Sequence, residues 1–243
     1  MKLSLKIALL AIQVLIMGWC ASTLYADEVT DLINKAMTYE SNQSVQYEVT
    51  ETYQNDLTHK TTVKRYTVLK KGQNEVRTDA DTGNLNVKKG GKQKFMVQGN
   101  MVESSDIGSI FAFFLADYQS GKIKAAIVTK NETIVLKGTR EGYKFKAVFS
   151  KDPVLLLACD SQDKTGESAF EGDYTYDFNA DPVTPVKTVE SGTLVENGVV
   201  ISQYRKKLEY RNYVKAIDLT EDVFSDETVT QQKVVKKVRV EKK

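Results

Sequence analysis

Apolar and polar residues alternate along much of the chain after residue 43. Val45, Tyr47 and Val49 fall on one side of an extended segment, and Gln46 and Glu48 fall on the other. A period of two residues is typical of a half-buried β-strand. Comparable segments predict further strands at 61–70, 75–78, 84–88, 94–98, 124–129, 133–137, 143–149, 154–158, 174–178, 186–194 and 199–210.

Turn signals separate these predicted strands. Gly90-Gly91 and Asn197-Gly198 are two examples, and the second pair tolerates the positive φ angles of a two-residue hairpin. Short connections of this kind join neighbouring strands in an antiparallel arrangement. Because a sheet of about ten or more long strands tends to curl, the sequence favours a barrel or half-barrel over a flat layer. A two-sheet sandwich is the alternative.

Two segments have helical rather than extended spacing. Apolar residues of the first recur at helical intervals and predict an amphipathic opening helix that lies against the sheet: Val29, Leu32, Ile33, Ala36 and Met37. The second segment, residues 107–118, is apolar on nearly every side and has Gly121 just beyond it, which predicts a short helix. Such a helix is buried on more than one face, or buries one face only part of the time. A last helical turn is predicted at 220–224.

The N-terminus has the pattern of a secretory signal peptide. Two lysines precede an apolar stretch at residues 7–17, and small residues follow. We therefore expect residues 1–26 to be a signal peptide and the mature protein to work outside the cytosol. The apolar stretch is too short for a membrane-spanning helix, and no later stretch approaches that length. Cys20 follows the bulky Trp19, which disfavours lipid anchoring at that cysteine.

Charge limits the possible partners. The chain has 34 basic and 32 acidic residues, and the expected signal peptide contains two of the lysines, so the mature protein is close to neutral. Nucleic acid is therefore not expected as a partner, because its recognition requires a basic face. Residues 27–225 are expected to form one domain. The basic tail at 226–243 indicates a solvated tail or an added edge strand, with an anionic-surface anchor as the alternative.

Candidate chemistry is sparse. His59 is the only histidine, and Cys159 is the only cysteine beyond the expected signal peptide, so we expect no catalytic residues, no metal site and no cofactor. Asp160, Asp163 and Glu167 lie close together, but their spacing does not fit a calcium loop. An enzyme of unrecognised type stays open only if these acids surround a cation.

Several segments taken in order carry a resemblance to a known family. The opening helix runs into residues 44–49, the apolar helix 107–118 follows the central strands, and a polar hairpin covers 160–167. Residues 210–219 and the terminal Phe224 are similar to a family's final strand and terminal phenylalanine. In this order the chain resembles the periplasmic lipoprotein carriers and sorting proteins of the LolA, LolB and mycobacterial lipoprotein-transport group, over roughly residues 27–225.

This resemblance implies a fold and a function. In the family a bent antiparallel sheet forms an incomplete barrel, and helices close it over an apolar cavity that takes acyl chains. It implies a non-enzymatic bacterial periplasmic carrier that binds acyl chains of lipids or lipoproteins for outer-membrane lipoprotein sorting, with possible inner- or outer-membrane partner proteins. The alternative is an envelope sensor or scaffold that binds a protein partner.

The resemblance also assigns candidate residues. The lid and cavity are expected to contain Ile107, Ile110, Phe111, Phe113, Phe114, Leu115, Tyr47, Val49 and Phe145. The Arg65-Tyr66 pair occupies the place of an arginine-aromatic strand that in the family continues with tryptophan. The family arginine latches the lid, which makes Arg65 the latch candidate. An ordinary exposed strand arginine is the alternative reading of Arg65.

Overall fold

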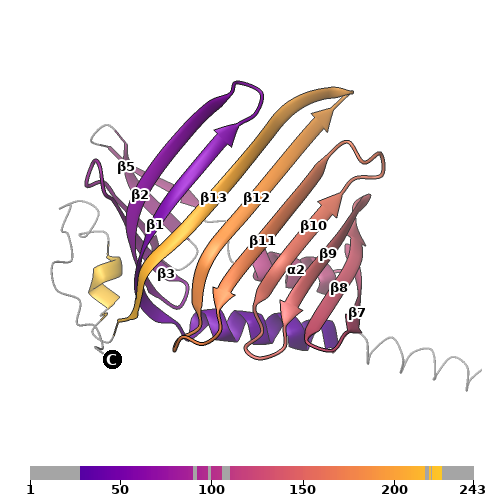
Figure 1. Cartoon of the computed structure of the whole chain (residues 1–243), viewed down its shortest axis with the longest axis horizontal. Helices are drawn as coiled ribbons and strands as arrows, with labels where there is room; N and C mark the ends of the chain where they lie inside the picture. The colour runs from indigo at the N-terminus through magenta and orange to yellow at the C-terminus, as the bar shows by residue number, and fades with distance from the viewer. Residues whose placement is uncertain are drawn as a thin grey trace, which may run out of the picture.

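A single antiparallel sheet of 13 strands dominates the computed structural model, which describes residues 28–89, 92–97, 100–105, 110–216, 219 and 221–225. The sheet is strongly curved but does not close into a barrel (Figure 1). Its strands are β1 (Ser44–Asn55), β2 (Lys60–Lys71), β3 (Asn74–Asp79), β4 (Leu85–Lys89), β5 (Lys92–Val97), β6 (Asn100–Ser105), β7 (Ile123–Thr129), β8 (Thr133–Arg140), β9 (Tyr143–Ser150), β10 (Leu156–Gln162), β11 (Ala169–Asp177), β12 (Thr184–Glu196) and β13 (Val199–Lys215).

The strand order explains how the sheet stays open. It runs β6-β5-β4-β3-β2-β1-β13-β12-β11-β10-β9-β8-β7, so β1 and β13 pair in the middle and β6 and β7 form the two edges. The helix α2 (Ile110–Gln119) lies in the chain between these two edge strands. From β1 the chain therefore adds strands outward to the edge strand β6. After α2 it continues at the other edge, β7, and adds strands back to β13 in the centre.

Residues 28–41 form a helix that lies along one end of the strands (Figure 1). Its stripe of Val29, Leu32, Ile33 and Ala36 is at most 3% exposed. These side chains pack with Leu136 of β8 and Phe149 of β9. The predicted amphipathic helix is confirmed, and the side of the sheet that it covers is called the inner face below.

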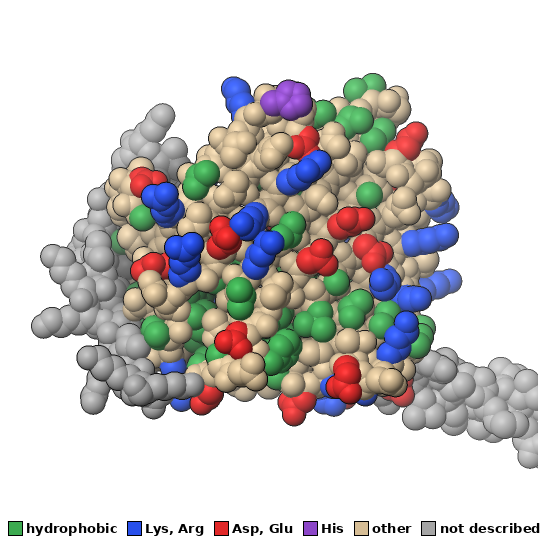
Figure 2. Space-filling model, in the orientation of Figure 1, with side chains coloured by type: hydrophobic (Ala, Val, Ile, Leu, Met, Phe, Trp, Pro, Cys, Tyr) green, Lys and Arg blue, Asp and Glu red, His purple; other side chains and the backbone are tan. Residues whose placement is uncertain are grey.

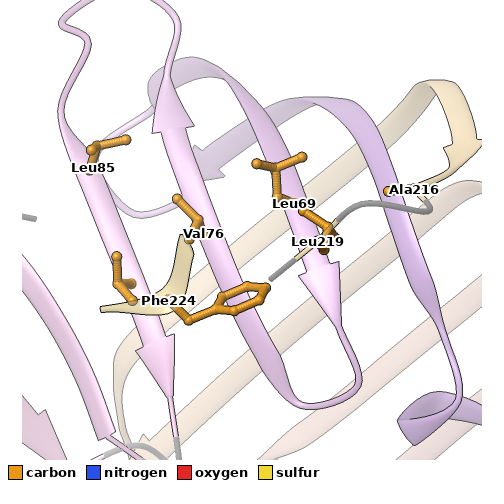
Figure 3. Packing of buried hydrophobic residues seen from close by; sticks show 7 residues of the cluster. Leu69, Val76, Leu85, Ala216, Leu219 and Phe224 are labelled. Carbon is orange, nitrogen blue, oxygen red and sulfur yellow. The ribbon is translucent and has the colours of Figure 1, made fainter. Parts of the chain in front are cut away.

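The opposite, outer face has a separate hydrophobic core over strands β2 to β4. Here Leu69, Val76 and Leu85 pack under the C-terminal segment, as Figure 3 shows, and Val87 belongs to the same cluster. That segment contributes Ala216, Leu219 and Phe224, the last from the short 3₁₀ helix η1 (Glu221–Phe224). The predicted last helical turn is confirmed, and we call these seven residues the outer cluster.

Elsewhere the outer face is solvated. Figure 2 shows lysine and arginine side chains interspersed with acidic ones on this face. Lys207 and Glu209 of β13, for example, form an ion pair of 2.8 Å with both side chains about two-fifths exposed. Mixed charges of this kind suit a solvated sheet face.

Most of the predicted architecture is confirmed. The curved antiparallel sheet and the short apolar helix are present, and one sheet replaces the two-sheet alternative. Strand β6 was not predicted, while β11 starts earlier and β13 ends later than their alternation indicated. The predicted signal peptide and basic tail lie outside the described residues, so the three domain boundaries stay predictions. Among the described residues, no helix combines the length and apolar character needed to cross a membrane.

Candidate functional site: an apolar hollow on the inner face

A hollow of about 620 Å³ lies between the inner face of the sheet, α2 and the N-terminal helix. This volume falls within the range of small-molecule sites, about 300–1,000 Å³. Most of its lining is apolar or aromatic, and comes from the N-terminal helix, α2 and β7 to β11: Ile33, Phe111, Phe113, Phe114, Ile123, Leu136, Tyr143, Phe145, Ala147, Phe149, Leu156, Phe170 and Tyr174.

The helix α2 forms one wall of this hollow. Phe111 packs against Phe149 with ring centroids 6.2 Å apart, and Phe114 meets Phe145 edge-on at 5.6 Å. Phe113, by contrast, is 50% exposed although it also lines the hollow. Part of the apolar surface of α2 is thus not covered by other protein side chains.

Charged side chains hold the C-terminal end of α2 to the edge of the sheet. Asp117 lies 2.7 Å from Arg140 at the end of β8 and 3.6 Å from Lys122. Gly121 then adopts a φ of +78°, which a residue without a Cβ accommodates readily. Because an ion pair exposed on one side contributes at most about 1 kcal/mol, this anchor is weak.

Glycines in the strands let aromatic rings lie close to the floor of the hollow. A Cβ on Gly138 would lie 2.5 Å from Cζ of Phe145 and 2.3 Å from the carbonyl oxygen of Lys124. The ring of Phe145 therefore covers the β8 backbone at the position where β8 and β9 pair Gly138 with Phe145. The floor is smooth and aromatic there instead of being filled by another side chain.

The hollow has a polar end on β10 to β13. Glu190 accepts a hydrogen bond from the hydroxyl of Tyr174 at 3.4 Å and forms an ion pair with Lys206 at 3.4 Å. Cys159 lies 3.7 Å from the Tyr174 hydroxyl. Burial raises the pKa of the Cys159 thiol and of the Tyr174 phenol, so both groups stay protonated at neutral pH.

Beyond this end, tyrosines cover the middle of the inner face. Tyr47 stacks on Tyr213 at 5.2 Å and meets Tyr210 at 5.8 Å. Tyr66 donates a hydrogen bond to Glu51, and the guanidinium of Arg77 lies 5.2 Å from the centre of the Tyr66 ring. Burial raises the pKa of Tyr47 and of Tyr213, which keeps their hydroxyls neutral.

The structure brings four of the nine predicted lid and cavity residues into the lining: Phe111, Phe113, Phe114 and Phe145. Leu115 packs in the core beside them without lining the hollow. Tyr47 and Val49 lie on the inner face of β1, where Val49 is 4% exposed. Ile110 is the first residue of α2, and Ile107 lies outside the described residues.

Arg65 lies away from this site. Its side chain is exposed and alternates along β2 with Tyr66, whose hydroxyl bonds Glu51 on the inner face. Adjacent residues of a strand point to opposite faces, so Arg65 belongs to the outer face. The ion pair that reaches α2 comes instead from Arg140.

Two acidic side chains of the 160–167 hairpin have partners within the chain. Asp163 Oδ1 accepts hydrogen bonds from the backbone of Thr165, Gly166 and Glu167, which closes its own turn. Asp160 forms an ion pair with Lys146 at 3.6 Å. No group of three or more His, Cys, Asp or Glu side chains with metal-binding geometry occurs within the described part of the chain.

Sequence reasoning missed much of the lining. Ile33 was assigned only to packing against the sheet, and Leu136, Leu156 and Ile123 were not singled out. Alternation along each strand could have indicated these residues, because apolar residues on the same face of the sheet as Phe145 and Phe149 face the same space. Glu190 and Arg140 have no such signal, since a charged residue in a strand is usually solvated.

The fold and the hollow together define a class: a curved, open antiparallel sheet whose inner face is covered by helices over an apolar space. Solved structures of the same class resemble this chain. A LolA superfamily protein from Nitrosomonas europaea has a TM-score of 0.54 at 14% identity, with 82% of this chain and 98% of that chain covered. A putative outer membrane lipoprotein-sorting protein domain from Vibrio parahaemolyticus has a TM-score of 0.53 at 13% identity, covering 82% and 97%.

A third structure of the same fold, a DUF1329 family protein from Desulfovibrio piger, has a TM-score of 0.57 at 12% identity, with coverage of 84% and 99%. These likenesses confirm the resemblance in fold to the LolA group. At the level of sequence, neither a protein-family model nor a curated protein matches the chain. The comparisons therefore concern the fold.

Proposed function

We propose that this protein binds acyl chains of lipids or lipoproteins in the hollow beneath α2, and acts as a non-enzymatic periplasmic carrier in outer-membrane lipoprotein sorting. The observation that supports it is the incompletely filled, aromatic-lined space between α2 and β7 to β11. Structures of the same fold include one described as a putative outer membrane lipoprotein-sorting domain, which agrees with this cargo.

The energetics of the hollow favour an acyl ligand. Burial of one methylene contributes about 0.8 kcal/mol, so ten methylenes contribute about 8 kcal/mol before the cost of ordering the ligand. A flexible chain can follow the curved floor between Phe145 and Leu136. Binding of this kind requires no catalyst.

Release requires that α2 be held only moderately. Its half-exposed Phe113 and the weak Asp117–Arg140 ion pair at its C-terminal end meet that requirement. A cargo carrier works when the empty and loaded states differ by a few kcal/mol, because then a membrane or partner can shift the balance. In this proposal α2 covers the empty hollow and contacts the acyl chains in the loaded protein.

The test is a titration of the purified protein with a fluorescent fatty-acyl probe, together with organic-solvent extraction of the protein as isolated. We expect saturable binding and co-purified acyl lipid. Phe114→Glu places a charge in the hollow and should abolish saturation, whereas Phe178→Glu changes an exposed phenylalanine (44%) that does not line it. Absence of saturable binding by the folded wild-type protein would refute the proposal.

A further inference from the structure

The polar end of the hollow consists of Tyr174, Glu190 and Lys206, which we call the polar triad. Tyr174 and Glu190 line the hollow directly, and Lys206 contacts Glu190 from the neighbouring strand β13. Glu190 and Lys206 are only 20% and 30% exposed. The triad is thus a polar group beside the apolar lining residues, and the hollow is also lined by Arg140, Glu141, Lys146 and Asp160.

The triad is electrically balanced. Lys206 faces Glu190 at 3.4 Å, and the phenol of Tyr174 stays neutral. Two other cations on this side of the sheet also have acidic partners, since Lys70 lies 2.8 Å from Glu40 and Arg77 pairs with Glu75. A negatively charged ligand group placed at the triad would meet the carboxylate of Glu190 as well as the ammonium of Lys206.

The contacts within the triad are also long. The distance from the Tyr174 hydroxyl to Glu190 Oε1 and the distance from Lys206 Nζ to Glu190 Oε2 are both 3.4 Å. Good hydrogen bonds are about 2.7–3.2 Å long, so these polar atoms are incompletely satisfied. A small ligand group can add shorter hydrogen bonds here without breaking the ion pair.

Glycines let the side chains of this polar end lie close to the sheet. Gly172 and Gly192 lie on strands β11 and β12 beside the triad, and the register pairs Gly172 with both Cys159 and Glu190. A Cβ at Gly172 would lie 3.0 Å from the Tyr174 hydroxyl and 3.2 Å from the Cys159 sulfur. The Tyr174 hydroxyl and the Cys159 sulfur therefore lie directly over Gly172, and both residues line the hollow.

Resting on the acyl-binding function proposed above, we infer that the cargo carries an uncharged, hydroxyl-bearing head group, and that the polar triad binds it. A hydroxyl donates to the carboxylate of Glu190 and accepts from the ammonium of Lys206 or the phenol of Tyr174, so one group satisfies both partners. A carboxylate or phosphate head has acceptors only and is repelled by Glu190. The head group at the triad leaves the acyl chain to extend over Leu156 and Phe145 toward α2.

The test compares two ligands with the same acyl chain, 1-lauroylglycerol and laurate, as competitors of the fluorescent acyl probe at pH 8. We expect lauroylglycerol to displace the probe at concentrations at least tenfold lower than laurate. Glu190→Gln removes the carboxylate charge and leaves Lys206 unbalanced, so it should improve displacement by laurate about tenfold. Lys206→Met should weaken displacement by laurate instead.

Glu209→Gln is the matched control, because Glu209 pairs with a lysine of β13 on the outer face. It should leave both competition curves unchanged, and circular dichroism should show native folding of every variant. Equal displacement by the two ligands in the wild-type protein, or an unchanged laurate curve in Glu190→Gln, would overturn the inference while leaving acyl binding intact. A wild-type protein that does not bind the probe would instead refute the proposed function itself.

Discussion

The two apolar regions of this protein, the outer cluster and the hollow, use similar residues in opposite ways. In the outer cluster all seven side chains are at most 7% exposed, because the C-terminal segment folds back over β2 to β4. On the inner face α2 and the N-terminal helix cover β8 to β10, yet Phe113 stays half exposed and a space of about 620 Å³ is left.

Under the proposed function, this difference separates a region that the chain itself completes from a region that a ligand completes. Phe224 fills the outer cluster, whereas Phe111 and Phe114 contact the opposite wall of the hollow only along part of α2. Buried side chains stabilise the folded state more when neighbouring side chains surround them completely. We therefore expect substitutions in the outer cluster to affect folding and substitutions in the hollow to affect binding.

The largest effect is expected for Phe224→Ala. The side chain is 1% exposed, and truncation of a buried phenylalanine costs about 3–5 kcal/mol through lost transfer energy and the cavity left behind. Urea unfolding should show this loss in the free energy of unfolding. The variant that remains folded should bind the acyl probe with wild-type affinity, and a parallel loss of affinity would contradict the separation of the two regions.

The next effect concerns the glycines of the inner face. Gly138→Ala should cost about 1–3 kcal/mol, because its Cβ would overlap the backbone oxygen of Lys124 as well as the ring of Phe145. Gly192→Ala is the control: its Cβ would meet only the side chain of Tyr204, at 2.7 Å, and that ring can move. Thermal unfolding of the two variants measures the difference, and equal destabilisation would show that the Phe145 floor is not tightly placed.

Phe114→Ala should mainly affect binding. Its ring contacts Phe145 edge-on and lines the hollow, so its removal takes away ligand contact area. We expect the dissociation constant of the acyl probe to rise about tenfold, which corresponds to 1.4 kcal/mol. Fluorescence titration of this variant beside Phe178→Ala provides the measurement, and indistinguishable affinities would place the ligand elsewhere.

The smallest effect is expected at the anchor of α2. Asp117→Asn breaks the ion pairs with Arg140 and Lys122, and exposed pairs of this kind contribute about 0.2–1 kcal/mol. For the two pairs together, the free energy of unfolding should fall by no more than about 2 kcal/mol. Dissociation of bound probe, followed by stopped-flow fluorescence, should accelerate by up to about fivefold, the rate equivalent of 1 kcal/mol. An unchanged dissociation rate would mean that opening of α2 does not limit release.

The sequence predicts the sheet well because strand alternation is a local property. Tyr47 and Val49 share the inner face as expected, and the Asn197-Gly198 turn joins β12 to β13 with positive φ at both residues. Alternation does not predict strand β6, because residues 100–105 contain only two apolar side chains, which are followed by a glutamate and two serines. Its pairing with β5 is set by the hairpin rather than by its own pattern.

The site is predictable only in part. The apolar character of α2 marked Phe113 and Phe114 from the sequence, because an all-round apolar helix needs more than one partner. The contact of Glu190 with Lys206 depends on the register of β12 and β13, a long-range property that local patterns do not carry. The placement of Arg65 shows the same limit, since a shift of one residue along a strand exchanges the two faces.

Cross-linking with a photoreactive acyl lipid tests the central claim most directly, because it records where the acyl chain lies. The labelled protein is digested and the modified peptides are identified by mass spectrometry. The account predicts modification within α2, residues 110–119, and within the β9 segment, residues 143–150, which face each other across the hollow. Modification confined to the outer cluster or to solvent-exposed turns, with α2 and β9 unlabelled, would contradict it.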